Sequence, residues 1–295
     1  MASYLDPKND LVFKRIFGNH PDLLISFLNA LMPFEPGRVI ESIEYVSNEL
    51  VPDNPAKKFS VVDVRCRDNH NRHFIVEMQM EWSDFFPSRM LFNASKAYVQ
   101  QLDSGKIYTN LQPVYALAIL NSNFDRKTPE FYHRYQLANR ENTDEVIEGL
   151  ELIMVELLKF RAEKWSDRRM AVLWLRFLKE MNHGLESVPE DFLTDESIHE
   201  AADICEKGGF TEAELAVYEK NRDTILNELS FIADSIARVK KGREEGLAIG
   251  REEGAHAKTV QFVLNCARKG MSKEDIAEIV DLSAKEVATI LEETD

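Results

Sequence analysis

Three polar side chains lie in apolar segments of the sequence: Asp63 in VVDVRC, and Glu77 and Gln79 in FIVEMQM. Aspartate and glutamate are depleted in β-strands, so a carboxylate in each of these Val- and Ile-rich segments needs an explanation. Either the acids are edge residues that face water, or they form a functional site. A hairpin turn centred on His70 would place Asp63 and Glu77 opposite each other, with Cβ atoms about 5 Å apart.

Two opposed carboxylates favour a cation between them, because like charges side by side destabilise a sheet. Oxygen ligands of this kind suit Mg²⁺ or Mn²⁺, with water and substrate phosphate in the other positions. Side chains alternate along a strand, so Gln79 shares a face with Glu77, and the backbone carbonyl of Met78 adds a further oxygen. A register slip of one residue would instead place the two acids on opposite faces.

A metal ion bound between the acids would polarise a scissile phosphate and lower the pKa of a bound water, which would then attack in line. A third group must orient that water or stabilise the developing charge. Gln79 can orient the water by hydrogen bonding, but it has no charge. We expect Arg89 or Lys96, in the segment that follows, to supply the cation.

The surrounding segments predict the elements that position these residues. Residues 9–31 have apolar positions three and four apart, with a break near residues 18–21, and residues 84–106 predict another helix that ends at Gly105. Strands are expected at 42–50, 58–68 and 73–81, with turns at 51–56 and 68–72, and a strand buried on both faces is expected at 113–121. This mixture predicts an α/β (α+β) domain with a central sheet.

Beyond residue 130 the pattern is almost entirely helical, with the segments LELIMVELLKF, MAVLWLRFL and NELSFIADSIARV. After Lys241 the repeat GREEGLAIGREEG places glycines at 242, 246, 250 and 254. Glycine costs about 1 kcal/mol against alanine inside a helix. The repeat is therefore either a glycine stripe that a second helix approaches closely or a flexible, charged linker.

The last segment contains two capping boxes, Ser272 with Asp275 and Ser283 with Glu286. They predict short helices joined by tight turns, with a spacing that resembles a helix-turn-helix. Residues 284–293, however, offer one Lys and no Arg, Asn or Gln to base edges. We expect a small protein-contact module rather than a sequence-specific reader of DNA.

The formal net charge of −15 opposes nucleic-acid binding, since Lys and Arg supply most of the non-specific affinity for phosphate. Residues 1–120, however, carry 12 basic and 14 acidic side chains, whereas residues 121–295 carry 24 and 37, so the acidic excess lies outside the candidate site. The three cysteines and seven histidines show neither disulfide nor zinc spacing. Without a secretory signal or an apolar run of about 18 residues, we expect a cytoplasmic protein that does not enter a membrane.

An acid in the first helix, then D-x(n)-E-x-[K/Q] across adjacent strands, then a helix, is similar to the PD-(D/E)XK nuclease superfamily. More narrowly, the sequence resembles the Rpn family of recombination-promoting nucleases and transposases. The stretches that carry this resemblance are NDLVFKRIFG, LLISFLNALM, VVDVRC, FIVEMQM and AYVQQLDSGKIY. The resemblance covers about residues 6–160, and the glycine repeat and helical tail look like the variable C-terminal part of that family.

The resemblance implies a restriction-endonuclease-like central mixed sheet flanked by helices. It also implies a metal-dependent DNA endonuclease of recombination or mobile elements, which would cut with low sequence specificity. Asp63 and Glu77 match the metal-binding acids, and Gln79 stands where many superfamily members have lysine. Asp10, in the first helix, matches the accessory acid. The alternative for Asp10 is ordinary capping of the first helical turn.

We expect a nuclease domain over residues 1–165, a helical extension over 166–240, the glycine-repeat linker or helix over 241–256 and a helix-turn-helix-like tail over 257–295. The helical C-terminal region would support a homo-oligomer. An alternative to an active enzyme is a catalytically weak or inactive scaffold that acts through oligomerisation or partner binding. Retention of Asp63 and Glu77 favours the enzyme. The close pair of Glu77 and Gln79 disfavours a transposase with an RNase H-like fold.

Overall fold

The computed structural model describes residues 3–34, 37–50, 60–80, 83–102, 107–165 and 168–292. The chain divides into two compact units, Met1–Ile225 and Leu226–Asp295, and the boundary falls within the long helix α6 (Glu212–Arg268). The predicted turn at 51–56 and the predicted helix end at Gly105 lie outside the described residues. No helix in the described ranges is long and apolar enough to cross a membrane.

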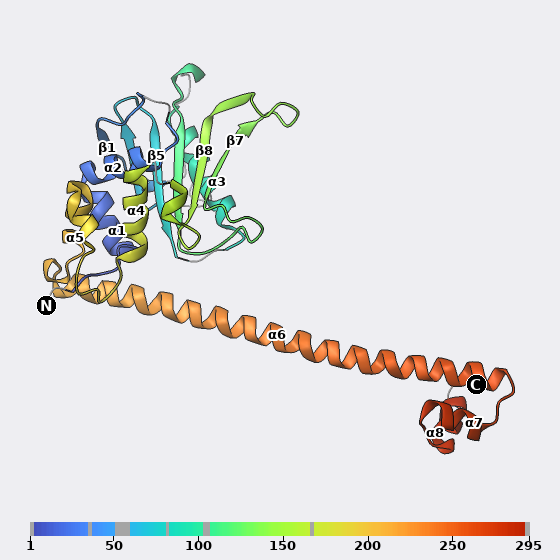
Figure 1. Cartoon of the computed structure of the whole chain (residues 1–295). Helices are drawn as coiled ribbons and strands as arrows, with labels where there is room; N and C mark the ends of the chain where they lie inside the picture. Colours follow the sequence, from blue (N-terminus) through green and yellow to red (C-terminus); the bar gives the residue numbers. More distant parts are fainter. Residues whose placement is uncertain are drawn as a thin grey trace. The chain divides into compact units, whose positions relative to one another are not determined.

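The first unit is built on a six-stranded sheet in the order β1-β4-β5-β6-β8-β7 (Figure 1). Strands β5, β6 and β8 are parallel neighbours, and the other pairings are antiparallel, which confirms the predicted mixed sheet. A separate antiparallel pair is formed by β2 (Glu49–Leu50) and β3 (Ser60–Val61). The strands of the main sheet are β1 (Ile43–Tyr45), β4 (Val64–Asp68), β5 (His73–Gln79), β6 (Val114–Leu120), β7 (Tyr132–Ala138) and β8 (Val146–Glu156).

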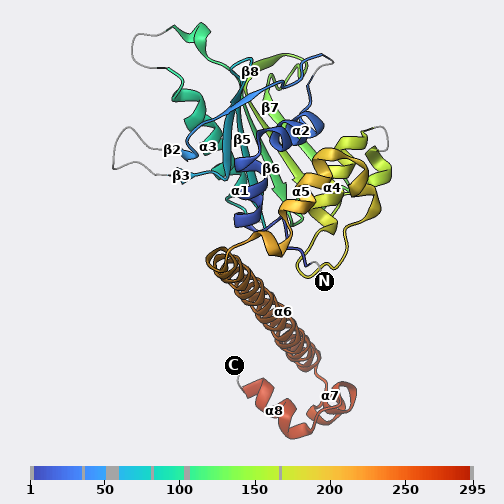
Figure 2. The same ribbon diagram turned by 90° about the vertical axis from the view of Figure 1, so that its left-hand side faces the viewer.

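Helices cover both faces of this sheet (Figure 2). One face packs against α3 (Phe86–Val99), where Ile75 and Ala118 meet Met90 and Ala94 in one apolar cluster. The other face packs against four helices through a larger core that includes Phe74 and other side chains of the alternate strand positions. These helices are α1 (Asp10–Asn19), α2 (Pro21–Leu31), α4 (Arg169–Glu180) and α5 (Glu196–Ile204).

The β4–β5 hairpin has the predicted register. Val64 pairs with Val76 and Arg67 with His73, so the turn is centred on His70. The expected strand at 58–68 is nevertheless divided into β3 and β4, because the chain bends at Asp63. The expected strand at 42–50 is likewise divided into β1 and β2.

The helical prediction beyond residue 130 was wrong for two segments, which form β7 and β8. The segment LELIMVELLKF lies mostly in β8, a strand between β6 and β7. Its side chains fill both faces, with Ile153 and Val155 in one core and Met154 in the other. A strand buried on both faces reads as a continuous apolar run, which periodicity alone does not distinguish from a buried helix. Strand β6 and the break between α1 and α2 are as predicted, whereas α3 is shorter than the predicted helix at 84–106.

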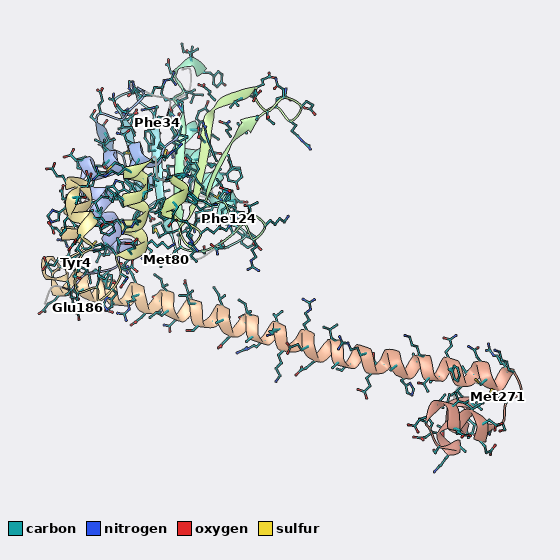
Figure 3. The ribbon with its side chains drawn as sticks, viewed as in Figure 1. Tyr4, Phe34, Met80, Phe124, Glu186 and Met271 are labelled. Carbon is teal, nitrogen blue, oxygen red and sulfur yellow. The ribbon has the colours of Figure 1, made fainter. Side chains whose placement is uncertain are left out.

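The second unit consists of most of α6 followed by α7 (Lys273–Val280) and α8 (Ala284–Glu292). Met271 lies in the connection between α6 and α7 (Figure 3). Both predicted capping boxes are present: the Ser272 hydroxyl accepts from the Asp275 N–H, and the Ser283 N–H donates to Glu286. The glycine repeat is helical, so the interpretation as a linker without fixed structure was wrong.

Candidate functional site

Alternation along β5 directs Glu77 and Gln79 toward α3. Ile75 belongs to the cluster under α3, and positions two and four residues further along the strand share its face. From α3, the Asn93 amide donates a 2.9 Å hydrogen bond to Oε1 of Glu77, and Arg89 Nη2 lies 3.4 Å from Oε2. Arg89 also donates to the side-chain carbonyl oxygen of Gln79. The four-residue spacing of Arg89 and Asn93 lets one helix face hold both polar residues of the strand.

Asp63 reaches the same strand from the bend between β3 and β4. Its Oδ2 accepts a 2.7 Å hydrogen bond from the Met78 N–H, so Asp63 does not continue the ladder that ends at the Val64–Val76 pair. The N–H and C=O of a strand residue lie on the same strand edge. The Met78 carbonyl therefore lies on the edge that faces Asp63, where it was predicted to provide an oxygen.

Helix α1 brings a second acid and a lysine to Asp63. Lys14 Nζ lies 2.7 Å from Oδ1 of Asp10 and 3.6 Å from Oδ1 of Asp63. Asn9, and not Asp10, caps α1 by accepting from the Leu11 N–H. Asp10 lies in the first turn of α1, where an acid stabilises the helix N-terminus, and it is also held beside the candidate site through Lys14.

The electrostatic environment of Asp63 favours its protonated form. The pKa of Asp63 is raised to about 6, mainly by burial and to a smaller extent by the charges of Asp10 and Glu77, while the Met78 N–H and Lys14 oppose the rise. The carboxylates of Asp10 and Glu77 both repel a negative charge on Asp63. A divalent cation bound at Asp63 would reduce this repulsion.

The residues of β5 and α3 line a cleft of about 540 Å³ near the carboxyl end of β5. In open α/β sheets, ligands bind outside the carboxyl ends of the strands. Phe85 at the start of α3 is strongly exposed at the rim of this cleft. The other lining residues are Val61, Asp63, Glu77, Met78, Gln79, Ser83, Phe86, Ser88, Arg89, Phe92 and Asn93.

A larger cavity, of about 720 Å³, lies at the opposite end of the sheet. Phe34 lines this larger cavity. Met80 directly follows Gln79, and Figure 3 shows Phe34 and Met80 at opposite ends of the sheet. The charged lining of the larger cavity is partly neutralised, because Arg72 is paired with Asp68 and Arg134 with Glu151. Greater volume does not make it the better candidate, since neither Asp63 nor Glu77 lines it.

The structure brings together Asp63, Glu77, Met78 and Gln79, with Asp10 connected through Lys14. Of the two cations predicted, Arg89 contacts Glu77, whereas Lys96 donates to the Leu50 carbonyl oxygen. Sequence reasoning missed Lys14 and Asn93. Lys14 follows Asp10 by four residues and Asn93 follows Arg89 by four, so helical spacing from the residues already chosen was the available signal.

The donor set fits a hard divalent cation. Among the described residues, no three His, Cys, Asp or Glu side chains gather closely enough to form a metal cluster. An ion here would be held by the carboxylates of Asp63 and Glu77 and the carbonyl oxygen of Met78, with water and substrate as further ligands. Such all-oxygen, partly hydrated sites are typical of Mg²⁺ and Mn²⁺.

Comparison with known families agrees with this geometry. The family model described as PD-(D/E)XK nuclease family transposase matches residues 7–235. The chain belongs to this family. The fold is accordingly restriction-endonuclease-like, and the protein is a nuclease related to transposases. No curated protein and no solved structure matches the chain.

The match to the PD-(D/E)XK nuclease family transposase model spans all of the polar residues of the site described above. It begins before Asp10 and Lys14 and includes the β4–β5 hairpin and α3. It ends at residue 235, within α6, so α7 and α8 lie outside it. The family assignment therefore concerns the unit that contains the cleft.

Proposed function

We propose that the chain is a Mg²⁺- or Mn²⁺-dependent DNA endonuclease that hydrolyses phosphodiester bonds in recombination or mobile-element processes. The observation that carries the proposal is the convergence of Asp63 and Glu77 in one cleft with Arg89 and Lys14 beside them. All of these residues lie within residues 1–165, the segment predicted as the nuclease domain, which forms one compact unit, Met1–Ile225, together with α4 and α5.

The side chains divide the work of binding and orientation. When bound, the divalent ion would polarise the scissile phosphate and lower the pKa of a bound water. Asp63 and Glu77 would hold the ion, and the Asn93 amide fixes the orientation of the Glu77 carboxylate. Arg89 places a positive charge beside Gln79 and stabilises the charge that develops on the phosphate.

The cleft also supports binding with low sequence specificity. Arg89 and Lys14 offer cations to phosphate groups, which carry no sequence information. The exposed ring of Phe85 offers an apolar face on which a base can stack, and every base has such a face. Contacts of both kinds tolerate many sequences.

Nicking of a supercoiled plasmid by the purified full chain tests the proposal. We expect nicking with Mg²⁺ or Mn²⁺, none with EDTA, and a loss of at least about 100-fold in Asp63→Ala and Glu77→Ala. Glu186→Ala, which changes an exposed acid away from the cleft, is the matched control and should cut at the normal rate. Metal-independent nicking, or equal rates in all three variants, would refute the proposal. A labelled RNA of the same sequence determines whether the substrate is DNA alone.

A further inference from the structure

Helix α6 exposes a long run of residues in the second unit. From Leu226 to Lys258, every residue except Ser235 is exposed. Large apolar side chains are among them, including Ile236 at 63% and Val239 at 73% exposure. Most helical stability in proteins comes from packing of an apolar face, and the glycines of the repeat add a cost of about 1 kcal/mol each. An unpartnered helix of this composition therefore calls for a partner.

Four of the exposed apolar residues, Leu229, Ile232, Ile236 and Val239, lie on one face of α6. Positions separated alternately by three and four residues face the same side of a helix and form the seam of a coiled coil. In α6 this seam has two charged members, Arg243 and Glu253, which stand on either side of Gly246 and Gly250. The seam consists of Leu229, Ile232, Ile236, Val239, Arg243, Gly246, Gly250, Glu253, Ala257, Val260 and Leu264.

We propose that α6 pairs with α6 of a second copy of this chain in an antiparallel coiled coil whose two-fold axis passes at the level of Ala248. In this register Arg243 lies opposite Glu253 of the second copy, and Gly246 lies opposite its Gly250. Val239 then meets Ala257, and beyond it Ile236 meets Val260 and Ile232 meets Leu264. A two-fold axis generates each contact twice, so the seam closes on itself.

Charge selects the antiparallel arrangement over the parallel one. In a parallel, in-register pair each seam residue meets its own copy, which would bury Arg243 against Arg243 and Glu253 against Glu253. Like charges in the seam are destabilising, whereas opposite charges there specify register and orientation. The antiparallel register converts both repulsions into attractions.

The same register accounts for the glycines. A Cβ at Gly246 or Gly250 would meet no atom within 4 Å in the single chain, so nothing in this unit requires glycine at these positions. Across the proposed axis they face each other and let the two helices approach closely. Leu247 and Ile249, both more than half exposed, then flank the glycines and pack against their own copies.

Light scattering of the full chain, with the metal removed, tests the pairing independently of nuclease activity. We expect a dimer, and about tenfold or greater weakening of self-association in Arg243→Glu and in Glu253→Arg. The double variant Arg243→Glu/Glu253→Arg restores the opposite charges and should dimerise like the natural chain. Glu252→Arg, an exposed change beside the seam, is the matched control. A monomeric natural chain, or a double variant weaker than both single variants, would overturn the proposal.

Disulfide formation tests the orientation. Val239→Cys alone should not cross-link to itself, whereas a mixture of the Val239→Cys chain with the Ala257→Cys chain should give a covalent heterodimer. Because Cys66, Cys205 and Cys266 are buried free thiols, the natural chain gives the background. Self-cross-linking of Val239→Cys would show a parallel pair. A monomeric intramolecular cross-link in a chain that carries both Val239→Cys and Ala257→Cys would show a hairpin within one chain. Either result would overturn the proposal.

Discussion

The side-chain amide of Asn93 donates a 2.9 Å hydrogen bond to Oε1 of Glu77, and both residues are buried. Loss of such a donor to a buried carboxylate lowers the free energy of unfolding by about 1–3 kcal/mol. We therefore expect Asn93→Ala to lower the free energy of unfolding by this amount, as measured by urea denaturation without metal. Alanine is the better helix former, so a change in helix propensity would act in the opposite direction. Unchanged or increased stability would show that the hydrogen bond does not hold Glu77.

Arg89 donates a hydrogen bond to the side-chain oxygen of Gln79, at the position where many superfamily members have lysine. Gln79→Lys would place two cations side by side, so we expect cleavage to fall about tenfold or more. The double variant Gln79→Lys/Arg89→Gln exchanges the two groups and should recover most of the rate. Plasmid nicking at fixed Mg²⁺ measures both. A faster Gln79→Lys single variant would show that Arg89 does not supply the cation.

Lys14 lowers the pKa of Asp63, and Asp10 raises it. Lys14→Met should therefore shift the acidic limb of the pH–rate profile upward by about half a pH unit or more, and Asp10→Asn should shift it downward. Lys14→Arg retains the charge and is the control for the packing of the long side chain. Shifts in the same direction for Lys14→Met and Asp10→Asn would contradict this arrangement.

The raised pKa of Asp63 also predicts how the stability of the metal-free protein depends on pH. Between pH 3.8 and about 6 the unfolded chain loses its Asp63 proton before the folded chain does, so stability falls as the pH rises through this window. The difference is worth up to about 3 kcal/mol. Because the Asp63 side chain is only 21% exposed, solvent screening is limited. We expect Asp63→Asn to be about 1–3 kcal/mol more stable at pH 8 in EDTA, by thermal or urea unfolding. A less stable variant at pH 8 would contradict the assignment.

Part of this fold could be predicted because local patterns determine it. The hairpin register follows from the turn at His70, and the break between α1 and α2 follows from Pro21 at the start of α2. Strand β8 could not be distinguished from a helix, because the apolar cores on the two sides of the sheet bury side chains on both of its faces. Such burial is a tertiary property that a single segment does not reveal.

The candidate site was predictable in its acids and less so in their partners. Asp63 and Glu77 are conspicuous because carboxylates are unusual in strands. The bend at Asp63 depends on the Met78 N–H, and the approach of Lys14 depends on how α1 packs against the sheet. Both are contacts between segments far apart in the sequence, so no local pattern indicates them.

Titration of the metal-free protein with Mn²⁺, followed by electron paramagnetic resonance, tests most directly whether Asp63 and Glu77 jointly hold a divalent ion. We expect saturable binding to the natural chain and to Glu186→Ala, competition by Mg²⁺, and at least about tenfold weaker binding to Asp63→Ala and to Glu77→Ala. Equal affinity of Mn²⁺ for the natural chain and for both of these variants would contradict joint binding of the ion by Asp63 and Glu77.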